Sequence, residues 1–156
     1  MQNWFQQDQY ILSHSGQYSI IKSYLTIIGN HRKLDTPDLI WNVTAQPKHR
    51  FITWLAYQNK FLTREILQQL HIPVNNTNCC MCNDQVDETA QYLFMEYSWS
   101  KEVRITVMQW AGIQLARGDV AMVLRSIKKE KWKQFKKEIV AAILEAIIYH
   151  TWKARN

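Results

Sequence analysis

The sequence predicts a mainly α-helical protein with a single domain. Apolar residues make up 47% of the 156 positions, glycine and proline are scarce at four and three copies, and apolar residues recur at helical spacing along most of the chain. A chain of this length and composition can bury its own core, which excludes a disordered or collagen-like protein and a complete multidomain polymerase. We therefore expect one domain over residues 1–156, with a short N-terminal β-hairpin and an irregular loop that contains the cysteines.

Local patterns predict the boundaries of the main regions. β-favouring residues flank the turn signal Ser15-Gly16, and Ser19 is placed to cap a helix, so a hairpin and a first helix are expected within residues 10–28. A helical core region follows over residues 48–115, with a cysteine loop at residues 79–86. A basic and then apolar stretch over residues 120–155 predicts one long helix or two consecutive helices.

Within these regions, residues 38–43 predict a short helical turn, and two helices are expected on either side of residues 58–60, the second starting near Phe61 and Leu62. Thr63 is a predicted N-cap of a helix that ends before Pro73. Helical patterns resume over residues 87–97 and 98–115, and Gly118 is the expected break.

The positive charge is concentrated at the C-terminal end. The net charge is +6, and residues 101–156 alone hold 12 basic and 5 acidic residues, a net of +7. Seven of those basic residues lie within residues 125–137, with Glu130 as the one acidic residue among them. Such a balance favours anionic partners, above all nucleic acid. The candidate nucleic-acid-binding residues are Arg125, Lys128, Lys129, Trp132, Lys133, Lys136 and Lys137.

On a continuous helix, the lysines at 129, 133, 136 and 137 share one face, and the packing face contains Phe135, Ile139, Ala142 and Ala146. Trp132 lies between the two faces, where it could stack on an unpaired base. The alternative is a solvated lysine face with Trp132 packed in the core. Residues 139–152 are apolar all round, which predicts a helix buried on every side or an interface.

The three cysteines indicate a reducing compartment. All of them lie within four positions, too close for a secreted disulfide framework, and Met1 is followed by polar and aromatic residues rather than a signal sequence. The longest apolar run, residues 139–152, is shorter than the roughly 20 residues that cross a bilayer. We expect an intracellular protein, nuclear or cytoplasmic, without membrane association.

Cys79-x2-Cys82 is half of a possible zinc site, because two thiolates at this spacing can hold one side of a tetrahedral ion. No second pair of ligands follows at a comparable spacing, which leaves His71 and Cys80 as candidates to complete the shell. The alternative is three small thiols without metal.

The cysteine segment and several others resemble a known family. Residues 79–97, CCMCNDQVDETAQYLFMEY, are similar to the zinc-binding region C-terminal to the reverse transcriptase of plant LINE-type (non-LTR) retroelements. That family reads C-x-x-C, an acidic stretch, and then H-L-F-x-x-C. Further segments match it in order: S-G-x-Y-S-I at 15–20, P-K-x-x-F-x-x-W-L at 47–55, L-T-R-x-x-L at 62–67 and W-K-x-R-N at 152–156.

The resemblance implies an accessory module of a retroelement protein, with zinc held at Cys79 and Cys82. The family's ligating His and last Cys fall on Tyr92 and Tyr97, so both ligands of the second half are lost. Tyrosine, with a reference pKa near 10, is a poor substitute at neutral pH. We expect a degenerate knuckle in which the two tyrosines pack in place of the metal, with no cofactor or at most weakly bound zinc.

No catalytic residues are predicted. The sequence contains no carboxylate pair of the polymerase type, no phosphate-cradling glycine loop and no nucleophile motif, so we expect a protein that is not an enzyme. The first hypothesis for its function is binding of RNA or single-stranded DNA through the basic helix face. The alternatives are a protein-interaction or scaffold module, which self-associates or binds a partner through residues 139–152, and a retroelement fragment without function.

Overall fold

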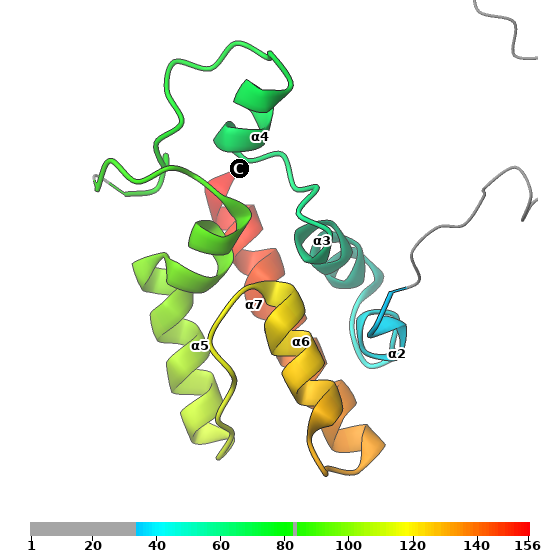
Figure 1. The fold of residues 1–156 in the computed structure, drawn as a ribbon. Coiled ribbons are helices and arrows are strands. Elements are labelled where there is room, and N and C mark those ends of the chain that lie inside the picture. Colours follow the sequence, from blue (N-terminus) through cyan, green and yellow to red (C-terminus); the bar gives the residue numbers. More distant parts are fainter. Residues whose placement is uncertain (1–33, 83) are drawn as a thin grey trace, which may run out of the picture. The chain divides into compact units, whose positions relative to one another are not determined.

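The computed structural model describes residues 34–82 and 84–156, of which residues Asp35–Asn156 form one compact unit. This part of the chain is helical, as predicted, and contains no strand beyond an isolated antiparallel bridge between Asn78 and Asp87. Figure 1 shows the helices arranged around the long C-terminal helix. The hairpin and first helix predicted over residues 10–28 lie outside the described residues.

Prolines begin the first two described helices. Helices α2 (Pro37–Ile40) and α3 (Pro47–Tyr57) each have proline in the first turn, where its fixed φ suits a helix and its missing N–H costs nothing. Helix α3 ends in a turn in which Asn59 takes a φ of 52°, within the predicted break. Phe61 and Leu62, expected in the next helix, lie instead in the connection.

Helix α4 (Arg64–Gln69) begins where the sequence predicted, because the Thr63 hydroxyl accepts a hydrogen bond from the Ile66 N–H at 3.4 Å. The cysteine loop follows it as an irregular segment. The chain then forms a π-helical turn, η1 (Tyr92–Glu96), and helix α5 (Ser98–Trp110). Helix α5 ends earlier than the predicted break at Gly118, because Gly112, with a φ of 66°, provides the left-handed residue that terminates it.

The C-terminal region forms two helices, α6 (Val120–Lys129) and α7 (Gln134–Arg155). Asp119 caps α6 by accepting a hydrogen bond from the Met122 N–H at 2.6 Å. Residues 130–133 connect the two helices, so the continuous helix behind the predicted lysine face does not exist. Although α7 is 22 residues long, no helix among the described residues is long and apolar enough to cross a membrane.

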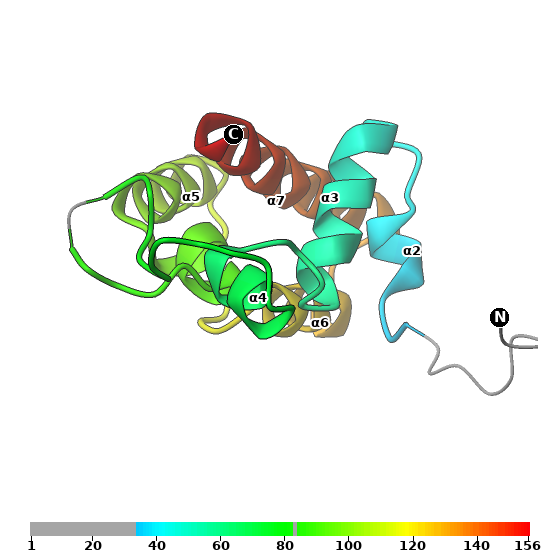
Figure 2. The ribbon, with the colours of Figure 1, turned by 90° about the horizontal axis from the view of Figure 1, so that it is seen from above.

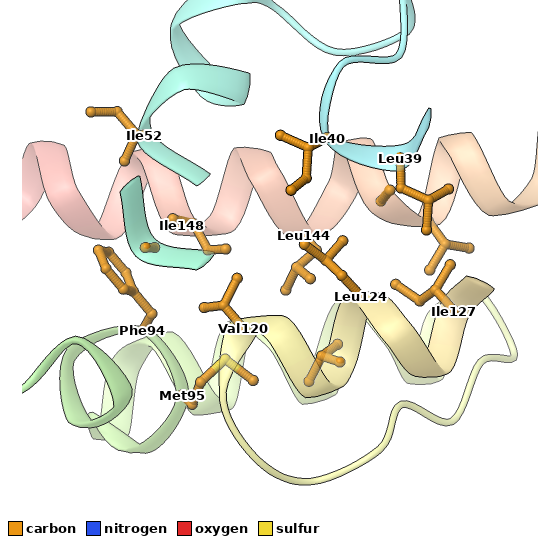
Figure 3. Packing of buried hydrophobic residues seen from close by; sticks show 14 of the residues in the cluster. Leu39, Ile40, Ile52, Phe94, Met95, Val120, Leu124, Ile127, Leu144 and Ile148 are labelled. Atoms are coloured by element: carbon orange, nitrogen blue, oxygen red, sulfur yellow. The ribbon is translucent and has the colours of Figure 1, made fainter. Parts of the chain in front are cut away.

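Helix α7 is the centre of the core, in contact with α2, α3, α5, α6 and η1 (Figure 2). Its buried positions follow a helical period: Val140, Ala141, Leu144, Glu145, Ile147, Ile148 and Thr151. Figure 3 shows Leu144 and Ile148 between the apolar side chains of α2, α3, α6 and η1. The packing face predicted for this helix is therefore wrong at Phe135, which is 68% exposed, and its other members, Ile139, Ala142 and Ala146, are half-buried beside the face that is fully buried.

Residues 139–152 are not buried on every side either. Ala142, Ile143 and Ala146 are half-buried, and His150 is exposed. Helix α5 packs on α7 but leaves part of this side open. The result is an apolar groove of about 680 Å³ between the two helices, lined by Trp99, Val103, Val107, Ile143, Ala146, Ile147, His150, Lys153 and Ala154.

Candidate functional site

The cysteine loop is closed at its base by backbone hydrogen bonds. The Cys79 N–H donates to the Val86 carbonyl at 2.8 Å, and the Glu88 N–H donates to the Thr77 carbonyl at 2.8 Å. The Thr77 hydroxyl also donates to the carboxylate of Asp87. The two arms of the loop are therefore joined without any metal.

Tyr92 and Tyr97, which the resemblance places at the family's second pair of ligands, both contact this loop. The Tyr92 hydroxyl lies 3.1 Å from the Sγ atom of Cys82, and the Tyr97 hydroxyl donates to the Met81 carbonyl at 3.4 Å. The π-helical turn places them together, because the Tyr97 N–H donates to the Tyr92 carbonyl at 2.7 Å, five residues back. Each tyrosine thus bonds to a different part of the loop.

A buried carboxylate anchors the other side of the loop. Glu88 is fully buried, and Arg155 donates to it from two guanidinium nitrogens, at 2.7 Å and 3.4 Å. The Arg64 N–H donates to the same carboxylate at 3.1 Å, and the Cys80 thiol donates to it at 3.3 Å. Glu88 therefore ties the C-terminal end of α7 and the start of α4 to the cysteine loop.

The pKa values agree with this arrangement. Burial by itself would raise the pKa of Glu88, but the hydrogen bond and positive charge of Arg155 outweigh burial and lower the pKa below its ordinary value. Burial raises the pKa of the Cys79 thiol, and burial together with the Glu88 hydrogen bond raises that of Cys80. The hydrogen bond to Cys82, followed by burial, raises the pKa of Tyr92. These thiols and this phenol stay protonated at neutral pH.

The residues present do not fit a structural zinc ion. Such a site needs four ligands, with cysteine as thiolate. Within residues 34–82 and 84–156, no three His, Cys, Asp or Glu side chains are grouped to hold a metal. Cys80 bonds to Glu88, and His71 is exposed, so neither completes a shell with Cys79 and Cys82.

Two of the predicted nucleic-acid-binding residues are held in ion pairs. Arg125 Nε lies 2.9 Å from the Asp35 carboxylate, and Lys128 Nζ lies 2.8 Å from that of Asp38. These pairs link the middle and end of α6 to the start of α2. The charges of Arg125 and Lys128 are therefore largely compensated within the protein.

The remaining predicted residues surround the turn between α6 and α7. Lys129 lies at the end of α6, whereas Lys133 precedes α7, so the lysines cluster around a turn rather than along one helix face. Trp132 is half-buried and packs against the core, with the Lys136 ammonium 4.7 Å from its ring centroid. Lys137 donates to the Lys128 carbonyl at 2.7 Å. The position of Trp132 thus agrees better with the alternative, in which its ring packs on the core, than with a ring free to stack on a base.

The remaining exposed lysines of this turn have no ion-pair partner in the described part of the chain. These four lysines form what we call the basic turn: Lys129, Lys131, Lys133 and Lys136.

Sequence reasoning missed Glu88, Arg64 and Arg155 as site residues. They lie in the acidic stretch, the L-T-R segment and the C-terminal W-K-x-R-N segment, which the resemblance matched without assigning them a role. These residues come together only in the folded structure, because Glu88 and Arg155 are 67 positions apart in the chain.

The sequence matches a protein-family model. The family model for zinc-binding in reverse transcriptase matches residues 18–103, more than half of the chain. Comparison with curated proteins and with solved structures finds no match. The family is an accessory module rather than a catalytic domain, and the matched residues include the cysteine loop and both tyrosines described above. The chain therefore belongs to the family described as zinc-binding in reverse transcriptase.

Proposed function

We propose that this protein is a retroelement-derived accessory module that binds RNA or single-stranded DNA through the basic turn. The observation that supports this proposal best is the group of lysines at residues 129, 131, 133 and 136, which are exposed and carry no ion pair within the described residues. Glu130 is the one acidic residue within this stretch. Phosphates are the ligand that such a concentration of ammonium groups favours.

The ion pairs of α6 also support this proposal. They compensate the charges of two basic residues of α6, whereas the lysines of the basic turn have no such partner among the described residues. Arg125 and Lys128 hold α6 on α2, whereas Lys137 bonds to the backbone at the end of α6. These contacts favour the observed conformation of the turn, which reduces the backbone ordering that phosphate binding requires. Exposed lysine side chains then supply the contact as mobile point charges.

The test is binding of a fluorescently labelled single-stranded RNA, measured by anisotropy at several salt concentrations. Changing the four lysines of the basic turn to glutamine should weaken binding and flatten its salt dependence. Each lost phosphate contact reduces the log–log slope by about 0.7. A matched control changes Arg125 and Lys128 to glutamine together with Asp35 and Asp38 to asparagine, which should leave the slope close to that of the wild type.

An unchanged affinity and slope in the basic-turn variant would contradict this proposal. Circular dichroism should show equal helicity in all variants, so that a loss of binding is not a loss of fold. The control above keeps the net charge, because it removes two positive and two negative charges. A second control changes four exposed basic residues outside the basic turn to glutamine, namely Lys60, Lys101, Arg117 and Lys153, and an equal loss of affinity in that variant would show that binding follows net charge alone.

The alternative function, protein interaction, is favoured by the apolar groove between α5 and α7. Its lining includes Trp99, 41% exposed, and the half-buried side chains of Val103 and Ala146. A polar change at the half-buried Ala146, such as Ala146→Lys, tests the groove with less risk to the core than a change at the buried Ile147. Sedimentation at high concentration should show a monomer for this variant and a dimer for the wild type if the groove joins two copies.

A further inference from the structure

Three aromatic side chains form a partly exposed strip at the end of helix α2 and on helix α3. Trp41 is 45% exposed and Phe51 is 51% exposed, and Trp54 lies between them. The Trp54 ring centroid is 6.3 Å from that of Trp41 and 5.8 Å from that of Phe51. We call Trp41, Phe51 and Trp54 the aromatic strip.

The strip has positive charge beside it. Lys48 precedes Phe51 by three residues, which places both on one face of α3. Its ammonium lies 5.0 Å from the ring centroid of Tyr149, and that ring is 5.4 Å from the ring of Trp152. Helix α3 contains no acidic residue along its whole length, so nothing on this helix repels an anion.

The strip is held by the fold. Trp54 packs against the hydrophobic core, so its ring has a fixed support from which Trp41 and Phe51 extend. Helix α3 contacts α7 and α6 along its inner side, where Ile52 and Ala56 are buried. Aromatic side chains have few rotatable bonds, which keeps the entropy lost on binding small.

Helix α2 joins the strip to the basic turn. Asp38, near its start, pairs with Lys128 of α6, and Trp41 follows Asp38 by three residues. At the rise of an α-helix, three residues span about 5 Å. One short helix therefore separates the end of α6 from the first ring of the strip.

We infer that the aromatic strip stacks on unpaired bases of single-stranded RNA or DNA, whose phosphates contact Lys48 and the basic turn. This inference rests on the proposed function and assigns it a base-contacting surface. Exposed rings beside uncompensated ammonium groups match a strand in which base faces and phosphates alternate. A duplex does not fit, because its base faces are covered by neighbouring base pairs.

The experiment compares two probes of equal length and charge, a labelled oligouridine and its abasic analogue, which keeps the phosphates and lacks the bases. The variants are Trp41→Ala and Phe51→Ala, at the two most exposed positions of the strip. The control is Trp110→Ala on α5, since Trp110 is 86% exposed and lies outside the strip. Circular dichroism and urea unfolding confirm that the variants are folded.

Each strip variant should bind oligouridine about 5- to 100-fold more weakly, from the usual effect of removing a ring that stacks on a base. Its salt dependence should not change, because no phosphate contact is lost. The abasic probe should bind all four proteins equally, and Trp110→Ala should bind oligouridine as the wild type does. Quenching of tryptophan fluorescence by oligouridine should decrease in Trp41→Ala.

Two results would overturn this inference, and they differ from failure of the proposed function. If the strip variants bind oligouridine as the wild type does while the basic-turn variant loses affinity, the strip is not the base-contacting surface and the proposed function stands. If the strip variants change only self-association, the strip is a protein interface. If the wild type binds neither probe, the proposed function itself fails.

Discussion

Replacing the buried carboxylate of Glu88 with an amide should destabilise the protein more than any change at its surface ion pairs. Glu88→Gln keeps the shape of the side chain and one carbonyl-type acceptor for the Arg64 N–H. The substitution removes the negative charge that faces Arg155. The Arg155 guanidinium, which donates to two carboxylate oxygens in the wild type, then faces one neutral oxygen and one amide N–H₂ group. The cysteine loop loses its link to α7.

The expected loss of unfolding free energy is about 3 kcal/mol, at the lower end of the 3–5 kcal/mol found when one partner of a buried ion pair is removed. The lower end applies because the Arg155 side chain is 15% exposed and retains some hydration, whereas that of Glu88 is 0% exposed. By contrast, the side chains of the Arg125–Asp35 pair are 40% and 48% exposed, and such surface pairs contribute about 0–1 kcal/mol. Since total stabilities are about 5–15 kcal/mol, the difference is readily measured.

The assay is urea unfolding at pH 7, followed by circular dichroism, with Asp38→Asn as the matched control at a surface pair. Arg155→Met and the double variant complete a mutant cycle, in which the double variant should lose less than the sum of the two single changes. A loss below 1 kcal/mol for Glu88→Gln, equal to that of Asp38→Asn, would refute the argument.

The pH dependence gives a second measure of the same pair. Because the pKa of Glu88 is lowered from 4.5, its contribution is present above that pH and is lost as the pH falls through the lowered pKa. The stability difference between wild type and Glu88→Gln should therefore shrink in acid.

Three further predictions concern the metal, a buried acid and a helix end. A chelator should leave the melting temperature of the protein unchanged, whereas Tyr92→His with Tyr97→Cys should take up about one zinc ion per chain and gain stability; stoichiometric zinc in the wild type, lost with the fold on chelation, would contradict this. Burial raises the pKa of Glu145 from 4.5 to about 8, although Arg50 opposes it, and its oxygens have no hydrogen-bond partner in the described part. Urea unfolding should show that the stability of the wild type relative to Glu145→Gln falls as the pH rises from 4.5 to 8, because Glu145 ionises freely there only in the unfolded chain. Gly112→Ala should cost about 1 kcal/mol in the same assay, since a φ of 66° disfavours a side chain, even though the new methyl group meets no atom within 4 Å; an unchanged stability would show that the helix end relaxes.

Local sequence signals predicted the helix boundaries correctly where a single residue determines the boundary. Thr63 caps α4 as expected, and the break near Asn59 is present. The turn between α6 and α7 has no Gly or Pro, and its lysines and Trp132 fit a helical pattern equally well. That turn is produced by packing, since Trp132 lies against the core as the chain passes from α6 to α7. The spacing of apolar residues along the chain does not indicate this packing of Trp132.

The candidate site was predictable only in part. The spacing of Cys79, Cys82, Tyr92 and Tyr97 located the loop and the side chains that contact it. The link between Glu88 and Arg155 depends on the tertiary fold, and no local pattern reports it. The aromatic strip was missed for another reason. Phe51 and Trp54 recur at helical spacing, which favours a core position, and only the packing of α3 shows that Phe51 points outward.

The π-helical turn has a consequence for the gene as well as for the protein. In an α-helix, residues five apart point about 140° away from each other, but here the extra residue in the turn brings positions 92 and 97 to the same loop. Histidine codons and cysteine codons each become tyrosine codons by changing a single base. On the correspondence that the resemblance implies, two point mutations therefore separate this chain from the family's full set of ligands, and the π-helical turn already directs both positions to the loop. We expect dependence on metal to be a property that nucleotide substitution can switch in this fold, without an insertion, a deletion or a new topology.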